Sequence, residues 1–274
     1  MLRQARETAG LGIEAAAKEQ EWSRPTMYRV EAGTVGVRKP DVVAMCALYG
    51  VSAEMTEAMV GLAAESKAKG WWHAYGDVIP AWFELYVGLE AAASRLRHFD
   101  PASVPGLLQT REYAEALLRS RLSIPTAEVE RLVEVRVERK QLLRRRSPAP
   151  PQLDVVLGED AIRRRAPGMA QQLRHLAEQA TAERISIRIV PATAAVHYGL
   201  TSGNFVILDF PPVGVRSPEP TTVYVEALTG ALYLDKPAEV AVYDDAWDAL
   251  DKLALDPGRS ADLMTMIAKE IDDA

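Results

Sequence analysis

Residues 13–31 restrict most strongly how this chain can fold. Their pattern predicts two short helices, 13–20 and 23–32, which are separated by only two residues. Ser23 is a favourable N-cap for the second helix, because its hydroxyl can accept a hydrogen bond from a free backbone N–H of the first turn. Gly33 is a typical stop signal at the C-terminal end of a helix. The pattern therefore indicates two helices that cross at a tight turn.

Three side chains support a close crossing of these helices. Ala17 is small and lies midway along the first helix, where a helix-turn-helix motif needs room for the second helix. Met27 and Val30 lie three residues apart and give the second helix one apolar face. The opposite face carries only hydrogen-bond donors and no acid: Arg24, Thr26, Tyr28 and Arg29. Such a face suits the negatively charged groove of DNA.

The neighbouring residues predict a small all-α domain around this motif. Further helices are expected at 2–9, 40–49 and 52–69, which makes five helices in a domain that covers residues 1–69. Apolar periodicity stops at 65–70, so the sequence predicts a hinge there. Residues 70–274 are expected to form a second domain.

Bulk charge does not indicate a nucleic-acid-binding protein. The chain has 32 basic and 38 acidic residues, a net charge of −6, and residues 1–69 contain nine of each sign. Strong nonspecific affinity for DNA requires an excess of basic residues, which release counterions from the phosphates. The prediction of DNA binding therefore depends on where the donors lie in the second helix.

The N-terminal residues resemble the Xre/Cro/phage-repressor type of helix-turn-helix regulators. The resemblance is carried by Leu2-Arg3, Arg6, Gly10-Leu11, Ala17, Trp22-Ser23 and Tyr28-Arg29-Val30-Glu31-Ala32-Gly33. It implies that helix 23–32 enters the major groove of a double-stranded operator. It also implies that Arg24 and Arg29 contact bases, that Pro25 packs on a base or sugar, and that Ser23, Thr26, Arg38 and Lys39 contact phosphates.

The same resemblance implies one structural pair and reveals two departures. An arginine at the place of Arg6 pairs with a glutamate at the place of Glu31, which braces the first and third helices. Ile13 stands where the family usually has a glutamine that binds a phosphate, and Glu21 stands where it usually has a glycine. A residue other than glycine is disfavoured at positive φ by about 1 kcal/mol or more.

Residues 70–274 predict an α+β domain with a mixed sheet. Strands are expected at 153–157, 185–190, 204–210, 222–226 and 231–234. Helices are expected at 82–93, 111–119, 126–146, 169–184, 238–254 and 259–271.

Four sequence blocks of this second domain also carry a resemblance. They are Gly70–Trp72, Trp82–Glu90, Val104–Thr110 and Glu226–Leu234. They look like the uncharacterised domain that follows this helix-turn-helix in many regulators of the actinobacterial type. The resemblance implies that a short partner protein is encoded nearby.

An aromatic block gives the second domain its candidate site. Trp71, Trp72, Trp82 and Tyr86 could line a pocket for a ligand or a partner. The alternative is that they form core or the seam between the two domains. A basic stretch at 139–146 could contact DNA phosphates beside the operator, but a solvated helix end explains it equally well.

The sequence predicts no enzyme. The four histidines, His73, His98, His175 and His197, show no metal-site spacing, and neither a nucleophile motif nor a phosphate-binding glycine loop is present. We therefore expect no catalytic residue, no metal and no cofactor. The lone Cys46 lies in an apolar run, where a core position is expected.

These observations together favour a cytoplasmic, sequence-specific transcriptional regulator. There is neither a signal peptide nor an apolar run long enough for a membrane span. A homodimer is expected, because one short recognition helix reads few base pairs. The second domain would sense a ligand or a partner protein. The alternative is the antitoxin-like half of a two-protein module, which binds a short partner protein and uses DNA binding for autoregulation.

Overall fold

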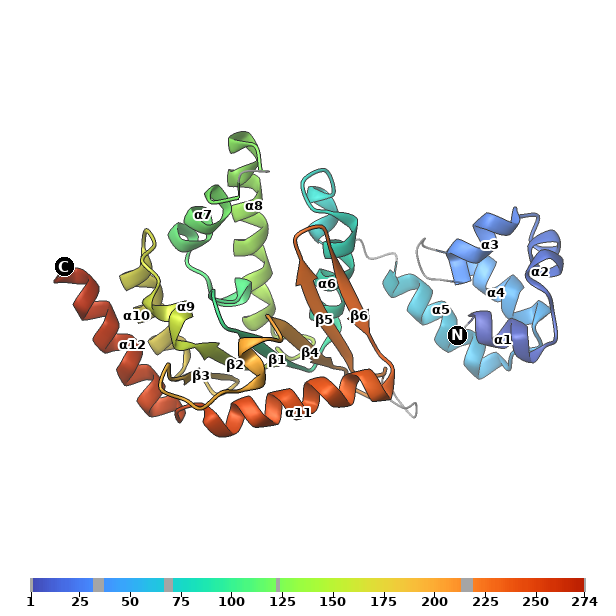
Figure 1. Cartoon of the computed structure of the whole chain (residues 1–274). Helices are drawn as coiled ribbons and strands as arrows, with labels where there is room; N and C mark the ends of the chain where they lie inside the picture. The colour runs from blue at the N-terminus through green and yellow to red at the C-terminus, as the bar shows by residue number, and fades with distance from the viewer. Residues whose placement is uncertain (1, 32–36, 67–70, 122–123, 213–218, 274) are drawn as a thin grey trace. The chain divides into compact units, whose positions relative to one another are not determined.

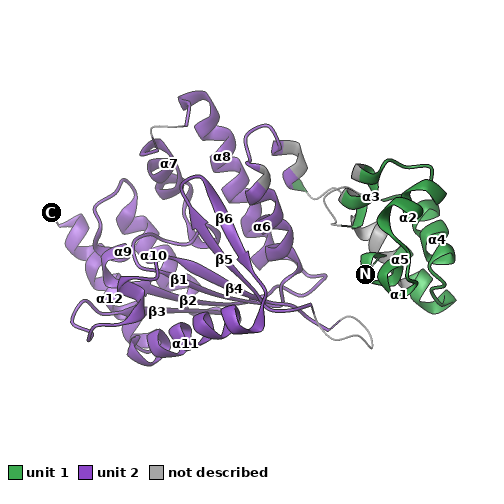
Figure 2. Ribbon diagram, turned by 45° about the vertical axis from the view of Figure 1, so that its right-hand side comes forward, with its two compact units in different colours: residues 1–71 green, residues 72–274 purple. Residues whose placement is uncertain are grey.

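The computed structural model describes residues 2–31, 37–66, 71–121, 124–212 and 219–273. The chain forms two compact units, residues 1–71 and residues 72–274 (Figure 2).

Unit 1 is helical in its described residues. The helices are α1 (Leu2–Thr8), α2 (Ile13–Glu19), α3 (Arg24–Glu31), α4 (Lys39–Leu48) and α5 (Ala53–Ser66). The predicted five-helix domain is confirmed, and the described helix ends lie within one residue of the expected ones. The expected helix ends at 32 and 69 and most of the expected hinge at 65–70 lie outside the described residues. Cys46 is fully buried, as expected of a core residue.

The crossing of α2 and α3 depends on the small and apolar side chains that the sequence places there. Ala17, Met27 and Val30 are buried in one cluster with Met45 and Tyr49. The predicted apolar face of α3 is therefore confirmed. This burial turns the opposite face of α3 outward.

Unit 2 contains one mixed sheet. Its strands are β1 (Arg95–Asp100), β2 (Gln152–Gly158), β3 (Ile185–Val190), β4 (Phe205–Asp209), β5 (Thr222–Ala227) and β6 (Gly230–Leu234). In the described residues the order is β3-β2-β1-β4-β5-β6. The strands β1, β2 and β3 are parallel, whereas β4, β5 and β6 are antiparallel to their neighbours. The expected α+β fold with a mixed sheet is confirmed.

Helices cover both faces of this sheet (Figure 1). They are α6 (Ala81–Ala92), α7 (Arg111–Arg119), α8 (Thr126–Arg139), α9 (Glu159–Arg163), α10 (Met169–Gln179), α11 (Pro237–Leu253) and α12 (Pro257–Asp272). On one face, α11 packs Trp247 and Leu250 against Phe99, Phe205 and Val223 of the sheet. Helices α6, α7 and α8 lie on the opposite face.

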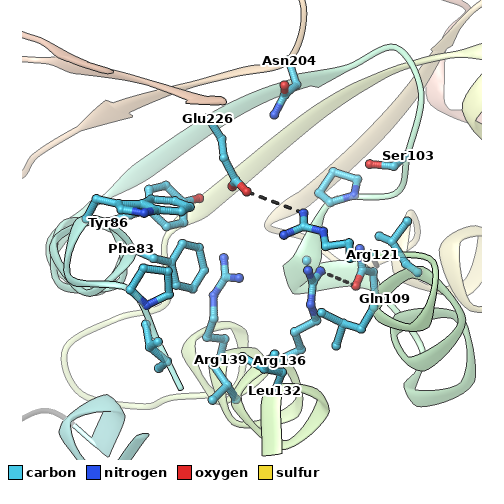
Figure 3. Close-up of a pocket in the computed structure, with 18 of the residues that line it drawn as sticks. Phe83, Tyr86, Ser103, Gln109, Arg121, Leu132, Arg136, Arg139, Asn204 and Glu226 are labelled. Atoms are coloured by element: carbon cyan, nitrogen blue, oxygen red, sulfur yellow. Dashed lines mark hydrogen bonds and ion pairs between the residues drawn. The ribbon is translucent and has the colours of Figure 1, made fainter. Parts of the chain in front are cut away.

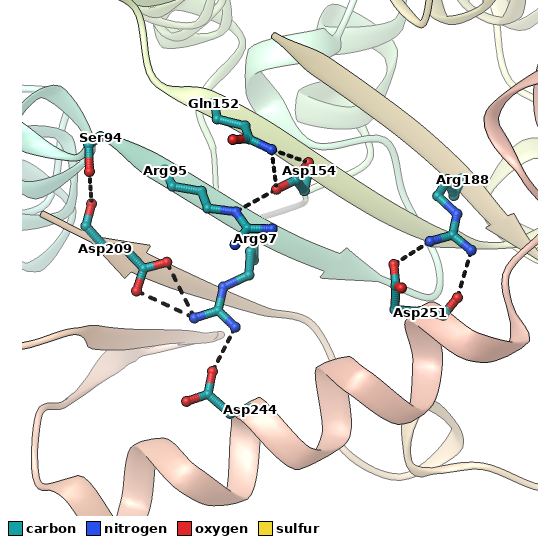
Figure 4. A network of polar contacts seen from close by, with 9 residues as sticks. All are labelled: Ser94, Arg95, Arg97, Gln152, Asp154, Arg188, Asp209, Asp244 and Asp251. Carbon is teal, nitrogen blue, oxygen red and sulfur yellow. Dashed lines mark hydrogen bonds and ion pairs between the residues drawn. The ribbon is translucent and has the colours of Figure 1, made fainter.

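The central strand β1 is not among the strands that the sequence predicts. It contains Arg95, Arg97, His98 and Asp100 among its six residues, which hides the period of two expected of a strand. The structure compensates these charges with acids from other elements (Figure 4). Arg97 pairs with Asp209 of β4 at 3.3 Å and with Asp244 of α11 at 2.7 Å, and Arg95 pairs with Asp154 of β2 at 2.7 Å.

Two predicted helices end earlier than expected. Helix α8 ends at Arg139 and continues as a short 3-10 helix, Lys140–Leu143, where the sequence predicts an α-helix to residue 146. Helix α10 ends at Gln179, five residues before the predicted end. In the described part of the chain, no helix is long and apolar enough to cross a membrane.

Candidate functional site

The outward face of α3 is the first candidate site. Thr26 N donates to Ser23 Oγ at 3.3 Å, which is the cap expected at the start of this helix. The side chain of Arg24 is 69% exposed, and Tyr28 is 62% exposed. Neither side chain is used to pack the core, so both are available to a partner outside the unit.

Several of the predicted DNA contacts already have intramolecular partners. The Ser23 hydroxyl bonds to that of Thr26 at 2.9 Å. Arg24 pairs with Glu14 of α2 at 3.0 Å, and Arg38 pairs with Asp41 through two hydrogen bonds of 2.8 and 2.9 Å. Exposed ion pairs of this kind contribute little to stability, so a phosphate or a base can replace the carboxylate at small cost.

The remaining predicted contacts are placed only in part. Lys39 is exposed and begins α4. Pro25 and Arg29 lie on α3, but their side chains are outside the described residues.

A buried ion pair holds α3 in place. Arg6 of α1 binds Glu31 at the end of α3 with two hydrogen bonds, 2.7 Å from Nε and 3.0 Å from Nη2. Arg6 Nη1 also donates to the carbonyl of Leu11 at 2.7 Å. The bracing role implied for this pair is confirmed. Glu21, in the turn before α3, has a φ of 56°, the conformation that favours the glycine usually found there.

The second candidate site is a cavity of about 400 Å³ in unit 2. It lies between helices α6, α7 and α8 and the face of strands β1, β4 and β5 that is turned away from α11 (Figure 3). His98, Val206, Tyr224 and Glu226 reach it from the sheet, because alternate side chains of a strand point to the same face. The cavity is thus a product of the mixed sheet and its helical cover.

One wall of the cavity is aromatic. Tyr86 is buried and stacks on Tyr224 with ring centroids 4.1 Å apart, and Phe83 stacks on Tyr86 at 5.6 Å. Trp82 meets Phe83 edge to face at 5.9 Å. The predicted pocket residues Trp82 and Tyr86 line this cavity. Trp71 and Trp72 do not belong to its lining, and both are half-buried.

Guanidinium groups lie beside and across from this aromatic wall. Arg139 of α8 makes a buried, two-pronged ion pair with Glu90 of α6, at 2.7 and 3.0 Å. Its guanidinium also lies 5.1 Å from the ring centroid of Phe83. Burial opposes the charge of Arg139, but the Glu90 carboxylate holds its pKa above the ordinary value. The expected solvated helix end is therefore wrong for this residue.

Arg136 lies one turn before Arg139 and has a different environment. Its Nη1 donates to Oε1 of Gln109 at 2.6 Å, and Gln109 is itself buried. Burial and the nearby charges of Arg139 and Arg121 lower the pKa of Arg136 to about 10, so it is still a cation at neutral pH. Arg121 is half-exposed and lies 3.7 Å from Glu226.

Other polar groups of the cavity have structural partners. Asp100 accepts hydrogen bonds from the N–H groups of Ala102 and Ser103 at 2.9 and 2.8 Å, which fixes the turn after β1. Burial raises the pKa of Asp100. Burial and the charge of Arg139 lower the pKa of His98 to about 3, so His98 is neutral at physiological pH.

Residues 1–59 match a helix-turn-helix domain, and residues 83–266 match a domain of unknown function (DUF5753). The second match covers more than half of the 274 residues. The chain belongs to the DUF5753 family. The cavity and the residues that line its two walls lie almost entirely within the DUF5753 match. No curated protein and no solved structure matches the chain.

The sequence does not predict the charged residues of the cavity in the DUF5753 domain. Arg121 lies in the loop after α7, Arg136 and Arg139 lie on α8, and Glu226 lies on β5. Nothing in their spacing shows that they meet. A partial signal exists in α8, where Leu132, Arg136 and Arg139 repeat at helical spacing and mix charged with apolar residues on one face.

Proposed function

We propose that this DUF5753 protein is a sequence-specific transcriptional regulator of the Xre/Cro type whose α3 reads the major groove. One observation carries the proposal: Met27 and Val30 bury one side of α3, while Arg24 and Tyr28 extend from the other side, where the described residues carry no acid. The match of residues 1–59 to a helix-turn-helix domain supports a DNA-binding regulator.

In this proposal the DNA contacts follow from side-chain chemistry. Arg24 breaks its ion pair with Glu14 and binds a guanine through O6 and N7, and Arg29 contacts a second base. Arg38, Lys39, Ser23 and Thr26 bind phosphates and set the position of α3 on the duplex. The protein acts in the cytoplasm as a homodimer, so that two copies of α3 read half-sites about 34 Å apart.

The experiment is a selection from random duplex DNA with the full chain, followed by binding of the enriched duplex at two salt concentrations. We expect Arg24→Ala and Arg29→Ala to relax the preference at one base-pair position each, at a cost of about 1–3 kcal/mol in discrimination. Arg38→Ala should weaken binding to all sequences and flatten the salt dependence. The control is Arg3→Ala, which removes an exposed ion pair with Glu7 on α1.

An enriched palindrome that is unchanged in Arg24→Ala and Arg29→Ala would contradict reading by α3. No enrichment at all would contradict sequence-specific binding by this chain.

The role of unit 2 in the proposal is to sense a signal, and the cavity favours a small ligand. A volume of about 400 Å³ lies within the range of small-molecule sites. We propose no catalytic role for this unit: in its cavity the Ser103 hydroxyl donates to Asp100 at 2.8 Å, but both oxygens of that carboxylate are held in the turn after β1.

A second candidate function is binding of a short partner protein, as in an antitoxin-like module that regulates its own synthesis. It is favoured by the hairpin of β5 and β6, where Leu228 and Leu232 are exposed and β6 ends the described sheet. Exposed apolar side chains beside an unpaired strand edge suit a protein partner. Co-purification of the short neighbouring protein with the full chain, lost in Leu232→Lys, would favour this alternative.

A further inference from the structure

The guanidinium groups of Arg121, Arg136 and Arg139 line one cavity of unit 2 (Figure 3). They differ in how closely a carboxylate approaches each of them. The Glu90 carboxylate balances the charge of Arg139 and accepts two hydrogen bonds from it. Arg121 has Glu226 at 3.7 Å, which is beyond ordinary hydrogen-bonding distance. Arg136 has a neutral partner, the side-chain oxygen of Gln109. Within the described part of the chain, Arg136 forms no ion pair with a carboxylate.

The remaining acids of the cavity do not supply the missing charge. Both oxygens of Asp100 are used by the turn that follows β1. Glu226 is shared, since it also accepts a hydrogen bond from the Tyr224 hydroxyl at 3.2 Å. Glu128 lies at the start of α8, and eight residues of helix, about 12 Å, separate it from Arg136. Arg136 is thus attracted by Glu226 but has no carboxylate in direct contact in the described residues, which is unusual for a buried cation.

The geometry of Arg136 suits an anion with two oxygens. Its Nη1 is held by Gln109, which is itself held by the Val104 carbonyl at 2.7 Å, so the guanidinium is fixed in the cavity wall. A fixed planar guanidinium has further N–H groups that can bind a carboxylate through two parallel hydrogen bonds. Arg121 is close enough to interact electrostatically with Arg136, and it can turn toward the same anion.

The apolar part of such a ligand can contact the aromatic residues of the cavity. Phe83 and Tyr86 form an aromatic wall on the far side of Arg139 from Arg136, and the Arg139 guanidinium lies 5.1 and 5.4 Å from their ring centroids (Figure 3). Leu132 of α8 also lines the cavity. The stacking of Tyr86 on Tyr224 keeps this wall rigid. Because Tyr224, Phe83 and Arg139 cover the faces of Tyr86, a planar aromatic ring meets this wall at the ring edges, in the edge-to-face arrangement that aromatic pairs favour.

We propose that the cavity of unit 2 binds a small aromatic carboxylate, with its carboxylate on Arg136 and Arg121 and its ring against Phe83 and Tyr86. The inference deepens the proposed sensing role and rests on it. On binding, the ligand supplies the direct carboxylate contact that Arg136 lacks and displaces the long contact between Arg121 and Glu226.

The test compares carboxylates with their neutral amides on the full chain in the absence of DNA. The probes are phenylacetate, indole-3-acetate and 2-naphthoate, each beside its primary amide, measured by isothermal titration and by the thermal midpoint of unfolding. We expect at least one carboxylate to bind at least tenfold more tightly than its amide. In Arg136→Gln this preference should disappear, and in Arg121→Gln it should fall severalfold.

The control variant is Arg131→Gln, on the same helix. Arg131 is half-exposed, pairs with Asp77 and does not line the cavity, so the preference for the carboxylate should be unchanged. Equal binding of acid and amide to the unaltered protein overturns the proposal, and this comparison needs no variant that folds. No binding of any of the three acids, or full binding by Arg136→Gln, overturns it too. Since no DNA is present, a failure here is distinct from a failure of α3 to read DNA.

Discussion

At the scale of single residues, Arg136 and Arg139 share a helix face but differ in how much they contribute to stability. Arg139→Gln leaves the Glu90 carboxylate buried without its partner, and Glu90 is only 2% exposed. We expect the free energy of unfolding of unit 2 to fall by about 3–5 kcal/mol, the usual effect of breaking a buried pair. Arg136→Gln removes a buried charge that no carboxylate contacts in the described residues, at the loss of one hydrogen bond worth about 1 kcal/mol. Urea unfolding of the full chain measures both, and a larger loss in Arg136→Gln would contradict this assignment of charges.

The backbone conformation of Glu21 determines how a substitution there changes the stability of unit 1. Its φ of 56° lies in the left-handed region, where side chains other than glycine are disfavoured. Glu21→Gly should therefore stabilise unit 1, by roughly 0.5–1 kcal/mol after the greater chain entropy of glycine in the unfolded state is subtracted. Gly50→Ala is the matched control, because Gly50 has a φ of 67° and open space beside it, so only the backbone conformation makes alanine there destabilising. Thermal unfolding with opposite signs for the two variants is the expected result, and a loss of stability in Glu21→Gly would exclude strain at this turn.

At the scale of elements, sequence patterns are informative wherever packing follows one helix or strand. The prediction for β3, residues 185–190, agrees with the structure, and so does the one for α7, because each has a regular apolar face. A local pattern does not predict strand β1, because Arg97 is stabilised there by hydrogen bonds to Asp209 and Asp244. These acids lie 112 and 147 residues away in the sequence. The charged residues of the cavity are not predicted either, because Glu90 lies 49 residues before its partner Arg139. Long-range charge compensation is invisible to a local pattern.

The polar face of β1 also makes unit 2 sensitive to pH. The pKa of His98 is lowered to about 3 in the folded state, by burial and by the charge of Arg139. An unfolded histidine has a pKa of about 6.5, so between these values the unfolded chain holds a proton that the native one does not. The free energy of unfolding should therefore fall as the pH decreases from about 6.5 toward 3, with a slope from His98 of up to about 1.4 kcal/mol per pH unit. Urea unfolding at several pH values should show a shallower slope for His98→Gln, and identical slopes would contradict a neutral buried His98.

At the scale of the whole molecule, the two compact units should unfold separately. Arg6 and Glu31 hold α1 to α3 within unit 1, and the side chain of Glu31 is 2% exposed. Arg6→Met leaves that carboxylate unpaired and should lower the unfolding midpoint of unit 1 alone, since chains with several domains rarely unfold in one step. Calorimetry of the full chain, with hydrogen exchange to assign each transition to residues, measures this. Arg3→Met, which breaks an exposed pair with Glu7, should leave both transitions in place. If Arg6→Met also removed hydrogen-exchange protection from α8 and the sheet, the prediction that the two units unfold separately would be wrong.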